Sequence, residues 1–524
     1  MKAFVQRFAD KILGVISGFD RVRFRGSLRL LASVGGTGAW LHSKGILLKD
    51  FLSFAEGLTK QLREQSKQIA EEAGRPVTYL EGFCNKEELV RQIRDEQGVA
   101  DNGLVAVLST LETCRSYDIY RNRETQQIDL RRRPRKALHH YFYFEDGKFG
   151  LTQVRLMTWF PFDVHVVLNG REWLARDLDK ANIGYLRRDN CFAHISDFEQ
   201  AQKLAAKHPK IGWPAQLERL LRRVHPLHQQ FFTSVDSYGP LSYYWTSDQT
   251  EWATDIAFRD SAELADLYPA LLHRGMEVFQ SPDVMRFLGH KLPAHGGVHG
   301  KFAGEVVSDL KRRAEGVRLK HRCGRNTIKM YDKFGSVLRI ETTLNDPAGL
   351  KVYRTKQSDP EGEKDWRPLR KSVADLSRRT ELSQKSNERY LESLSAFDCD
   401  VPLKKLTDKI CRHVQIGQRR HRGLRPFDPS DAALLEVVSR GEFAIAGFRN
   451  RDVRVALEGE QEEAADRRRA SSRTSRKLAL LRAHGLIKKI PHTHRYELTT
   501  SGRTTITALL AARNVTPKHL SAVA

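Results

Sequence analysis

The last hundred residues of this 524-residue chain carry its most restrictive pattern, a fixed succession of short elements. Apolar spacing, glycines and turn residues mark where each element begins and ends. The expected elements are, in order, helices at 431–441, 449–457 and 465–486, strands at 487–490 and 495–498, and a closing helix from 502. Two helices, a basic helix and a two-stranded wing are the order of a winged helix-turn-helix. We therefore expect residues 426–524 to form such a domain.

Positive charge is concentrated on the same segment. Residues 465–524 hold thirteen Lys or Arg and two acidic residues. Such charge neutralises phosphates while the third helix enters a major groove. The contact candidates are Arg473, Arg476, Lys477, Lys488, Lys489 and Arg495. The alternative is a winged helix that docks onto another protein, with these side chains as a solvated face.

The stretch LRAHGLIKKIPHTHRYELTTSGR, residues 481–503, resembles the winged-helix domains of MarR-like regulators. In those domains a similar GLI…Y.LT..G run forms the wing. The resemblance implies duplex DNA as the partner of this part of the chain.

Charge and composition bound the remaining possibilities. The chain holds 88 Lys and Arg against 64 Asp and Glu, a formal net charge of +24. This surplus favours nucleic acid or an anionic surface as partner, and 40% hydrophobic residues exclude a disordered chain. No apolar run reaches the roughly 18 residues of a membrane helix, and no signal peptide is recognised. Six dispersed cysteines indicate neither disulfides nor a zinc finger. We expect a cytoplasmic, nucleoid-associated protein that does not bind membranes.

The whole chain is expected to be a multidomain α+β protein, with mixed-sheet N-terminal and central domains ahead of the winged helix. The expected regions are 1–135 (α/β), 136–235 (a β-hairpin plus helices), 236–356 (central α+β), 357–425 (linker and helices) and 426–524. An amphipathic helix opens the chain, with an apolar face made of Phe4, Val5, Phe8, Ile12, Val15 and Ile16. Further elements are expected as strands at 20–28, 76–83 and 243–258, helices at 49–73 and 261–279, and two or three strands within 316–344.

The run 325–354 has a pattern that fits phosphate chemistry. If its two strands pair, Asp332 lies at the turn, Leu338 and Ile340 share one face, and Arg339 and Glu341 share the other. A carboxylate beside cations can hold Mg²⁺ or Mn²⁺ against a phosphate. Tyr353 could then attack the phosphorus and keep a covalent link to the strand. Asp255 and Asp20, both embedded in expected strands, need a partner or a cation, and Asp255 is a further candidate metal ligand. The alternative for each is capping or an ion pair with a nearby arginine.

This arrangement resembles the trans-acting Rep family of rolling-circle replication initiators. In that family a strand ending in Y-[DN]-K precedes a strand reading R-[VIF]-E, and the nicking tyrosine follows. The matching segments here are Tyr331–Lys333, Arg339–Glu341 and Tyr353. The resemblance implies Glu341 as metal ligand, Tyr353 as nucleophile and Asp332 as a further site residue. The structural alternative is an ordinary hairpin, in which Glu341 pairs with Arg339 or Lys329 and Tyr353 packs at an edge.

Two further basic clusters suit unpaired bases, with aromatic rings for stacking and cations for phosphates. The first cluster is Arg131, Arg132, Arg133, Arg135 and Lys136, followed by Tyr141, Tyr143, Trp159 and Phe160. The second is Lys311, Arg312, Arg313, Arg318, Lys320, Arg322, Arg325 and Lys329. Most of the aromatic residues are expected in the core, because strand aromatics on one face usually pack inside.

The sequence therefore predicts a nucleic-acid-binding protein of a mobile element or replicon. One form of this hypothesis is an Mg²⁺- or Mn²⁺-dependent DNA nicking-joining enzyme. The alternative is a binder without catalysis, either a scaffold for structured RNA or a winged-helix regulator. No P-loop is present, so nothing in the sequence indicates ATP.

Overall fold

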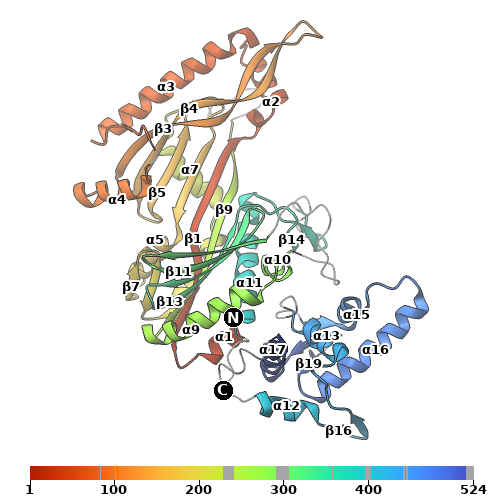
Figure 1. The fold of residues 1–524 in the computed structure, drawn as a ribbon. Helices are drawn as coiled ribbons and strands as arrows, with labels where there is room; N and C mark the ends of the chain where they lie inside the picture. Colours follow the sequence, from red (N-terminus) through yellow and green to blue (C-terminus); the bar gives the residue numbers. More distant parts are fainter. Residues whose placement is uncertain are drawn as a thin grey trace.

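The computed structural model describes most of the chain. Residues outside the description are 83, 101, 228–240, 291–305, 357–358, 360, 396–402, 441–442, 444–446, 492 and 515–524, together with the side chains of residues 2, 500 and 514. Both the glycine- and histidine-rich run 295–302 and His492 lie outside the described residues. The description gives a mixed α+β protein built on one large sheet (Figure 1).

Eleven strands form the large sheet. From edge to edge they are β10 (Val306–Arg313), β11 (Gly316–Cys323), β12 (Asn326–Lys333), β13 (Val337–Leu344), β9 (Tyr243–Phe258), β1 (Ile12–Leu28), β6 (Val164–Asn169), β5 (Gly150–Met157), β4 (Ile128–Asp146), β3 (Leu104–Arg121) and β2 (Thr78–Tyr79). Neighbouring strands are antiparallel except β2 and β3, which are parallel. β1 joins the two halves of the sheet, since it pairs with β6 on one side and β9 on the other. The sheet thus contains strands from the first three expected regions.

Helices cover the sheet and surround it. Those of the sheet-containing part are α1 (Lys2–Arg7), η1 (Leu30–Ala32), α2 (Val34–Ser43), η2 (Leu48–Asp50), α3 (Phe51–Glu72), α4 (Lys86–Gln97), α5 (Gly170–Lys180), α6 (Phe198–Ala205), η3 (His208–Lys210), α7 (Trp213–Arg222), α9 (Ser261–His273), η4 (Arg274–Val278), α10 (Ser281–Phe287), η5 (Val373–Asp375) and α11 (Leu376–Leu394). Two hairpins lie outside the sheet: β7 (Tyr185–Arg188) with β8 (Cys191–Ile195), and β14 (Lys351–Arg354) with β15 (Asp365–Pro368). No helix among the described residues combines the length and apolar character needed to cross a membrane.

The C-terminal elements form a separate unit with its own core (Figure 1, blue). They are α12 (Leu403–Cys411), β16 (Val414–Ile416), β17 (Arg419–His421), α13 (Pro429–Val438), β18 (Phe448–Arg449), α15 (Asn450–Glu458), α16 (Ala464–Ala483), β19 (Ile487–Lys489), β20 (Arg495–Leu498) and α17 (Thr500–Asn514). The three short strands pair in the order β18, β20, β19. An ion pair between Arg503 and Glu392 (3.3 Å) connects α17 to α11.

The two faces of the large sheet differ in character. Leu338 and Ile340 pack into an apolar core with α9, α10 and α11, whereas Arg339 and Glu341 lie on the polar face, as the pleat predicts. Between Phe19 and Arg21 the pairing of β1 with β9 shifts register. Such a bulge re-aims a side chain, and here Asp20 reaches Arg339 across the polar face.

Two expectations for the first half of the chain are wrong. The opening helix ends at Arg7, and β1 begins at Ile12. The apolar spacing fits a helix, but Ile12 pairs with Phe258, and β-branched residues favour a strand once a partner is available. The stretch after residue 170, expected to be mainly helical, also contains the hairpin β7–β8.

Candidate nucleic-acid interface

A closed ionic network occupies the polar face where β1, β9 and β13 meet. Arg339 donates to both oxygens of Asp255 (2.6 and 2.9 Å) and to Asp20 (3.2 Å). Arg171, from α5, lies 3.0 Å from Asp255, and Asn190 donates to both oxygens of Asp20 (3.1 and 3.0 Å). Burial works against ionisation of Asp255, but Arg171 and Arg339 lower its pKa overall. Asp255, a candidate metal ligand, is therefore held by two guanidinium groups.

Glu341 lies next to this network and has a cation of its own. Its carboxylate is 3% exposed and 2.5 Å from Lys329 on β12, and Thr343 donates to it at 3.3 Å. Burial opposes ionisation, but Lys329 lowers the pKa of Glu341. The structural alternative, in which Glu341 pairs with Lys329, is confirmed.

A fourth carboxylate, Glu251 of β9, completes the group. Its strand position is opposite Thr343 on one side and Arg21 on the other. Burial, with Glu341 second, raises the pKa of Glu251 to about 7. Despite these carboxylates, no three acidic, histidine or cysteine side chains of the described ranges are grouped so as to hold a metal ion.

The structure does not bring the other two expected catalytic residues to Glu341. Asp332 is paired with Leu338, on the apolar side of the pleat, and accepts a hydrogen bond from Gly335 N–H (3.0 Å). Tyr353 lies on β14, outside the large sheet, where its 60% exposed side chain packs on Trp366 at 5.8 Å. Asp332 caps a turn, and Tyr353 sits on a separate ribbon.

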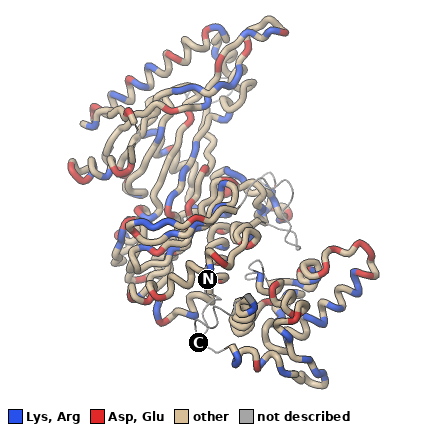
Figure 2. The backbone as a smooth tube through the Cα atoms, in the orientation of Figure 1, with Lys and Arg blue, Asp and Glu red and all other residues tan. Residues whose placement is uncertain are grey.

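The first basic cluster lies on the outer part of the β3–β4 hairpin, at the top of Figure 2. Arg131 and Arg133 both pair with Asp118 (3.5 and 3.0 Å). Arg135 lies over the ring of Trp159 at 3.9 Å, and Arg132 donates to a backbone carbonyl of η1. Lys136 is exposed beside them. Five cations therefore lie on one projecting ribbon, and Asp118 of the facing strand pairs with two of them.

The aromatic side chains after this cluster are not available for base stacking. Tyr141, Tyr143, Trp159 and Phe160 are all less than a tenth exposed. Their rings belong to the packed interior, so these four residues offer no free aromatic face, whereas Tyr120 of β3 is partly exposed with Arg131 over its ring at 5.1 Å.

The second basic cluster is divided between exposed and paired cations. Lys311, Arg312 and Arg313 are exposed on the edge strand β10, and Arg322 and Arg325 are exposed near the β11–β12 turn. Lys320 is partly buried. Three members have carboxylate partners: Arg318 lies 3.1 Å from Asp309, Lys329 pairs with Glu341, and the exposed Arg313 lies 3.8 Å from Glu315.

α16 carries the densest exposed charge in the C-terminal unit. Of the residues expected to contact DNA, Arg473 pairs with Glu458 and Lys488 with Glu497 (3.0 Å), whereas Arg476 and Lys489 are exposed. The sequence candidates omitted four exposed arginines of the same helix, namely Arg467, Arg468, Arg469 and Arg482. The sequence predicts the core side of this helix correctly, since Leu478, Leu481 and Leu486 lie in the core of the unit.

A polar cavity on the large sheet was also missed. It measures about 280 Å³ and is lined by Arg25, Thr113, Cys114, Arg115, His139, Arg155, Met157, Asp163, His165 and Asp248. Asp163 is 3.2 Å from Arg115 and also pairs with Arg25. Burial lowers the pKa of His139 to about 4 and of His165 to about 3, so neither imidazole is charged at neutral pH. The lining residues come from six strands, β1, β3, β4, β5, β6 and β9, and from the turn before β6, which no sequence pattern reveals.

Comparison with known proteins adds nothing to this geometry: no family model, no curated protein and no solved structure matches the chain.

Proposed function

We propose that this chain is a nucleic-acid-binding protein whose C-terminal unit is a winged helix that binds duplex DNA through α16. The element order α13, β18, α15, α16, β19, β20 supports this assignment, as does the strand order β18, β20, β19. In such a fold the helix before the two-stranded wing enters the major groove.

The observation that carries the proposal is the exposed face of α16. Its arginines alternate with small side chains such as Ser472, Ser475 and Ala479, all exposed. Small residues let a helix approach the floor of a groove, and flanking arginines meet phosphates or guanine edges. The opposite face is apolar, with Leu478 and Leu481 in the core of the unit.

We assign the β3–β4 hairpin as a second nucleic-acid contact. A two-stranded ribbon fits a groove or follows a single strand, and its exposed arginines supply phosphate contacts. Duplex DNA at α16 and a single strand or structured RNA at the hairpin would together account for the charge surplus.

The test is the double substitution Arg468→Gln/Arg476→Gln, measured by fluorescence anisotropy on duplex DNA across a salt series. Losing two phosphate contacts lowers the slope of log affinity against log salt by about 2. We expect at least a tenfold loss of affinity at moderate salt. The matched control is Arg412→Gln/Arg513→Gln, which removes equal charge from residues paired with Asp408 and Glu436. Equal effects of the two double variants would contradict a role for α16.

Nucleic acid that co-purifies with the protein separates DNA from RNA as the main partner. A discrete, RNase-sensitive species would identify an RNA scaffold and move the main interface to the hairpin. Protein free of RNA, with duplex binding intact, supports the regulator-like form of the proposal.

Metal-dependent nicking is a second candidate, favoured by one observation: the Tyr353 side chain is exposed, and the exposed Lys351 and Lys356 are close to it in the chain. We expect binding without cleavage, because Glu341 and Asp255 are already held by cations. Incubation with supercoiled DNA and Mg²⁺ or Mn²⁺ tests this. A covalent protein–DNA product that disappears in Tyr353→Phe would establish the nicking activity instead.

A further inference from the structure

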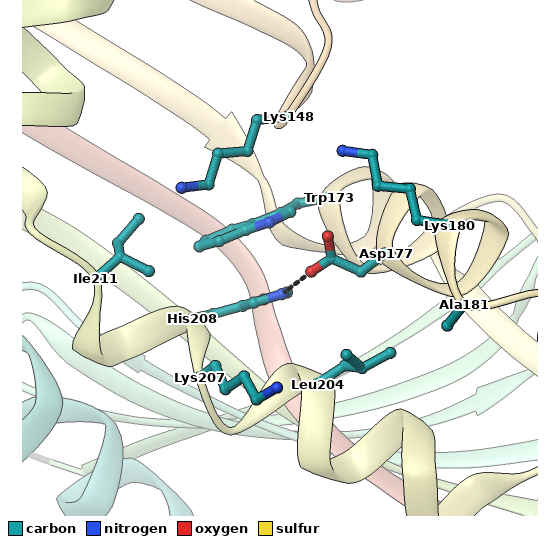
Figure 3. A pocket seen from close by; sticks show the side chains of 9 residues that line it. All are labelled: Lys148, Trp173, Asp177, Lys180, Ala181, Leu204, Lys207, His208 and Ile211. Carbon is teal, nitrogen blue, oxygen red and sulfur yellow. Dashed lines mark hydrogen bonds and ion pairs between the residues drawn. The ribbon is translucent and has the colours of Figure 1, made fainter.

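A second cavity lies between α5, the segment from α6 to η3 and the β4–β5 turn. It measures about 380 Å³, within the range of small-molecule sites. Its lining residues are Lys148, Trp173, Asp177, Lys180, Ala181, Leu204, Lys207, His208 and Ile211 (Figure 3).

Two stacked rings form the rigid centre of this cavity. Trp173 and His208 lie 3.5 Å apart and nearly parallel, at 7°. His208 is hydrogen-bonded to Asp177 through Nε2 (2.8 Å). Burial lowers the pKa of His208 despite this carboxylate, so the ring is neutral near pH 7. Phe149 packs edge-on against Trp173 at 4.9 Å. Because His208 covers one face of the indole and Phe149 packs against it nearly at right angles, the two stacked rings fix the shape of the cavity.

Three lysines surround this stack, and the only carboxylate of the lining is hydrogen-bonded to His208. Figure 3 shows Lys148 and Lys180 beside Trp173, and Lys207 beside His208. Lys180 donates to the Gly147 carbonyl (3.2 Å), and Lys148 lies 5.9 Å from the Trp173 ring centroid. Burial, with Arg219 second, lowers the pKa of Lys148. In the part of the chain that the structure describes, none of the three lysines has a carboxylate within ion-pair distance.

We propose that this cavity binds the phosphate monoester of an organic ligand of about mononucleotide size. Lysine ammonium groups are point charges that suit a phosphate dianion. Leu204, Ala181 and Ile211 supply an apolar wall for the rest of the molecule, and the volume exceeds what a bare inorganic phosphate fills. A free nucleotide and the 5′-phosphorylated end of a nucleic acid strand carry the same chemistry. The site is independent of α16, so it stands or falls separately from the proposed function.

The experiment titrates the full-length protein with uridine 5′-monophosphate, uridine, inorganic phosphate and two short oligonucleotides that differ only in a 5′-phosphate. Calorimetry reports the affinities. We expect uridine 5′-monophosphate to bind at least tenfold more tightly than uridine or inorganic phosphate. Preference for the free nucleotide identifies a small-molecule site, whereas preference for the phosphorylated oligonucleotide identifies a strand-end site.

Single variants locate the binding. Lys148→Met and Lys180→Met should each weaken it about tenfold, since each removes one of three charges. The matched control is Lys203→Met. Lys203 lies on α6, is paired with Glu199 (2.7 Å) and does not line the cavity. The affinity of this variant for uridine 5′-monophosphate should stay within twofold of the parent's. Thermal unfolding verifies that the variants fold. Equal binding of uridine and its phosphate, equal loss in all three variants, or no binding of any probe would overturn the proposal. Duplex binding by α16 should be unchanged throughout.

Discussion

At the scale of single residues, the polar face of the sheet buries charged side chains that are stabilised by pairing with one another. Arg339 and Arg171 are fully buried, and so is Asp255. Removing one partner of a buried ion pair leaves an uncompensated charge in a poor solvent, which costs far more than loss of an exposed pair.

Arg339→Met should lower the free energy of unfolding by about 3–5 kcal/mol, measured by urea denaturation. The control is Arg133→Met, whose side chain is 64% exposed in its pair with Asp118; we expect less than about 1 kcal/mol there. Similar losses in the two variants would show that the network is hydrated rather than buried.

Glu251 should make stability depend on pH. Its pKa in the folded protein, about 7, lies above the ordinary value of 4.5. The proton therefore favours the folded state: this contribution is complete below about pH 4.5 and is lost as pH rises through about 7. Glu251→Gln should be more stable than the parent at pH 8, by about 1–3 kcal/mol, and level with it at pH 4.5. Glu199→Gln, on exposed α6, should show no such difference. An unchanged pH profile in Glu251→Gln would assign the dependence to other groups.

At the scale of elements, the local sequence pattern was enough to place a strand or helix whose apolar periodicity and end signals are clear. The sequence predicted β9 with both ends correct, and predicted α3 and the C-terminal helices within a few residues. The strand expected at 20–28 lies within β1, but the first part of β1 was missed, because Phe4, Phe8 and Ile12 are spaced as in a helix and only the pairing with β9 decides otherwise. The ionic network was out of reach, since Arg339 meets Asp20 from 319 positions away and depends on a bulge. The pairing of Glu341 with Lys329 was foreseeable from the hairpin register alone.

The β3–β4 hairpin can be tested with two variants, one that removes positive charge and one that removes negative charge. Arg131→Gln/Arg133→Gln should weaken binding of single-stranded nucleic acid about tenfold, because two phosphate contacts are lost. Asp118→Asn removes the carboxylate that both arginines share and should strengthen binding. Electrophoretic mobility shifts measure both. Opposite shifts support the hairpin as an interface; weakening in both variants would indicate a structural role for the cluster.

At the scale of the whole molecule, the C-terminal unit has its own apolar core. Every residue of that core lies between Ile410 and Leu509. A fragment of residues 403–514 should therefore fold alone and unfold cooperatively by circular dichroism, while keeping the duplex affinity attributed to α16. A fragment without a thermal transition would show that the contact of Arg503 with Glu392 is essential. Residues 1–395 should keep the sheet and lose duplex binding.

The central place of β1 has a consequence for how the chain is made. This strand ends at Leu28, whereas β9, its longest partner, ends at Phe258 and is therefore synthesised much later. At about 5–20 residues per second, the edge of β1 that pairs with β9 waits roughly 10–50 s after β1 is made, whereas the other edge waits only until β6 is complete. During that interval its apolar residues and open backbone groups can recruit other chains. The yield of folded protein should therefore depend on how long β1 stays unpaired during synthesis. Slower synthesis should increase aggregation.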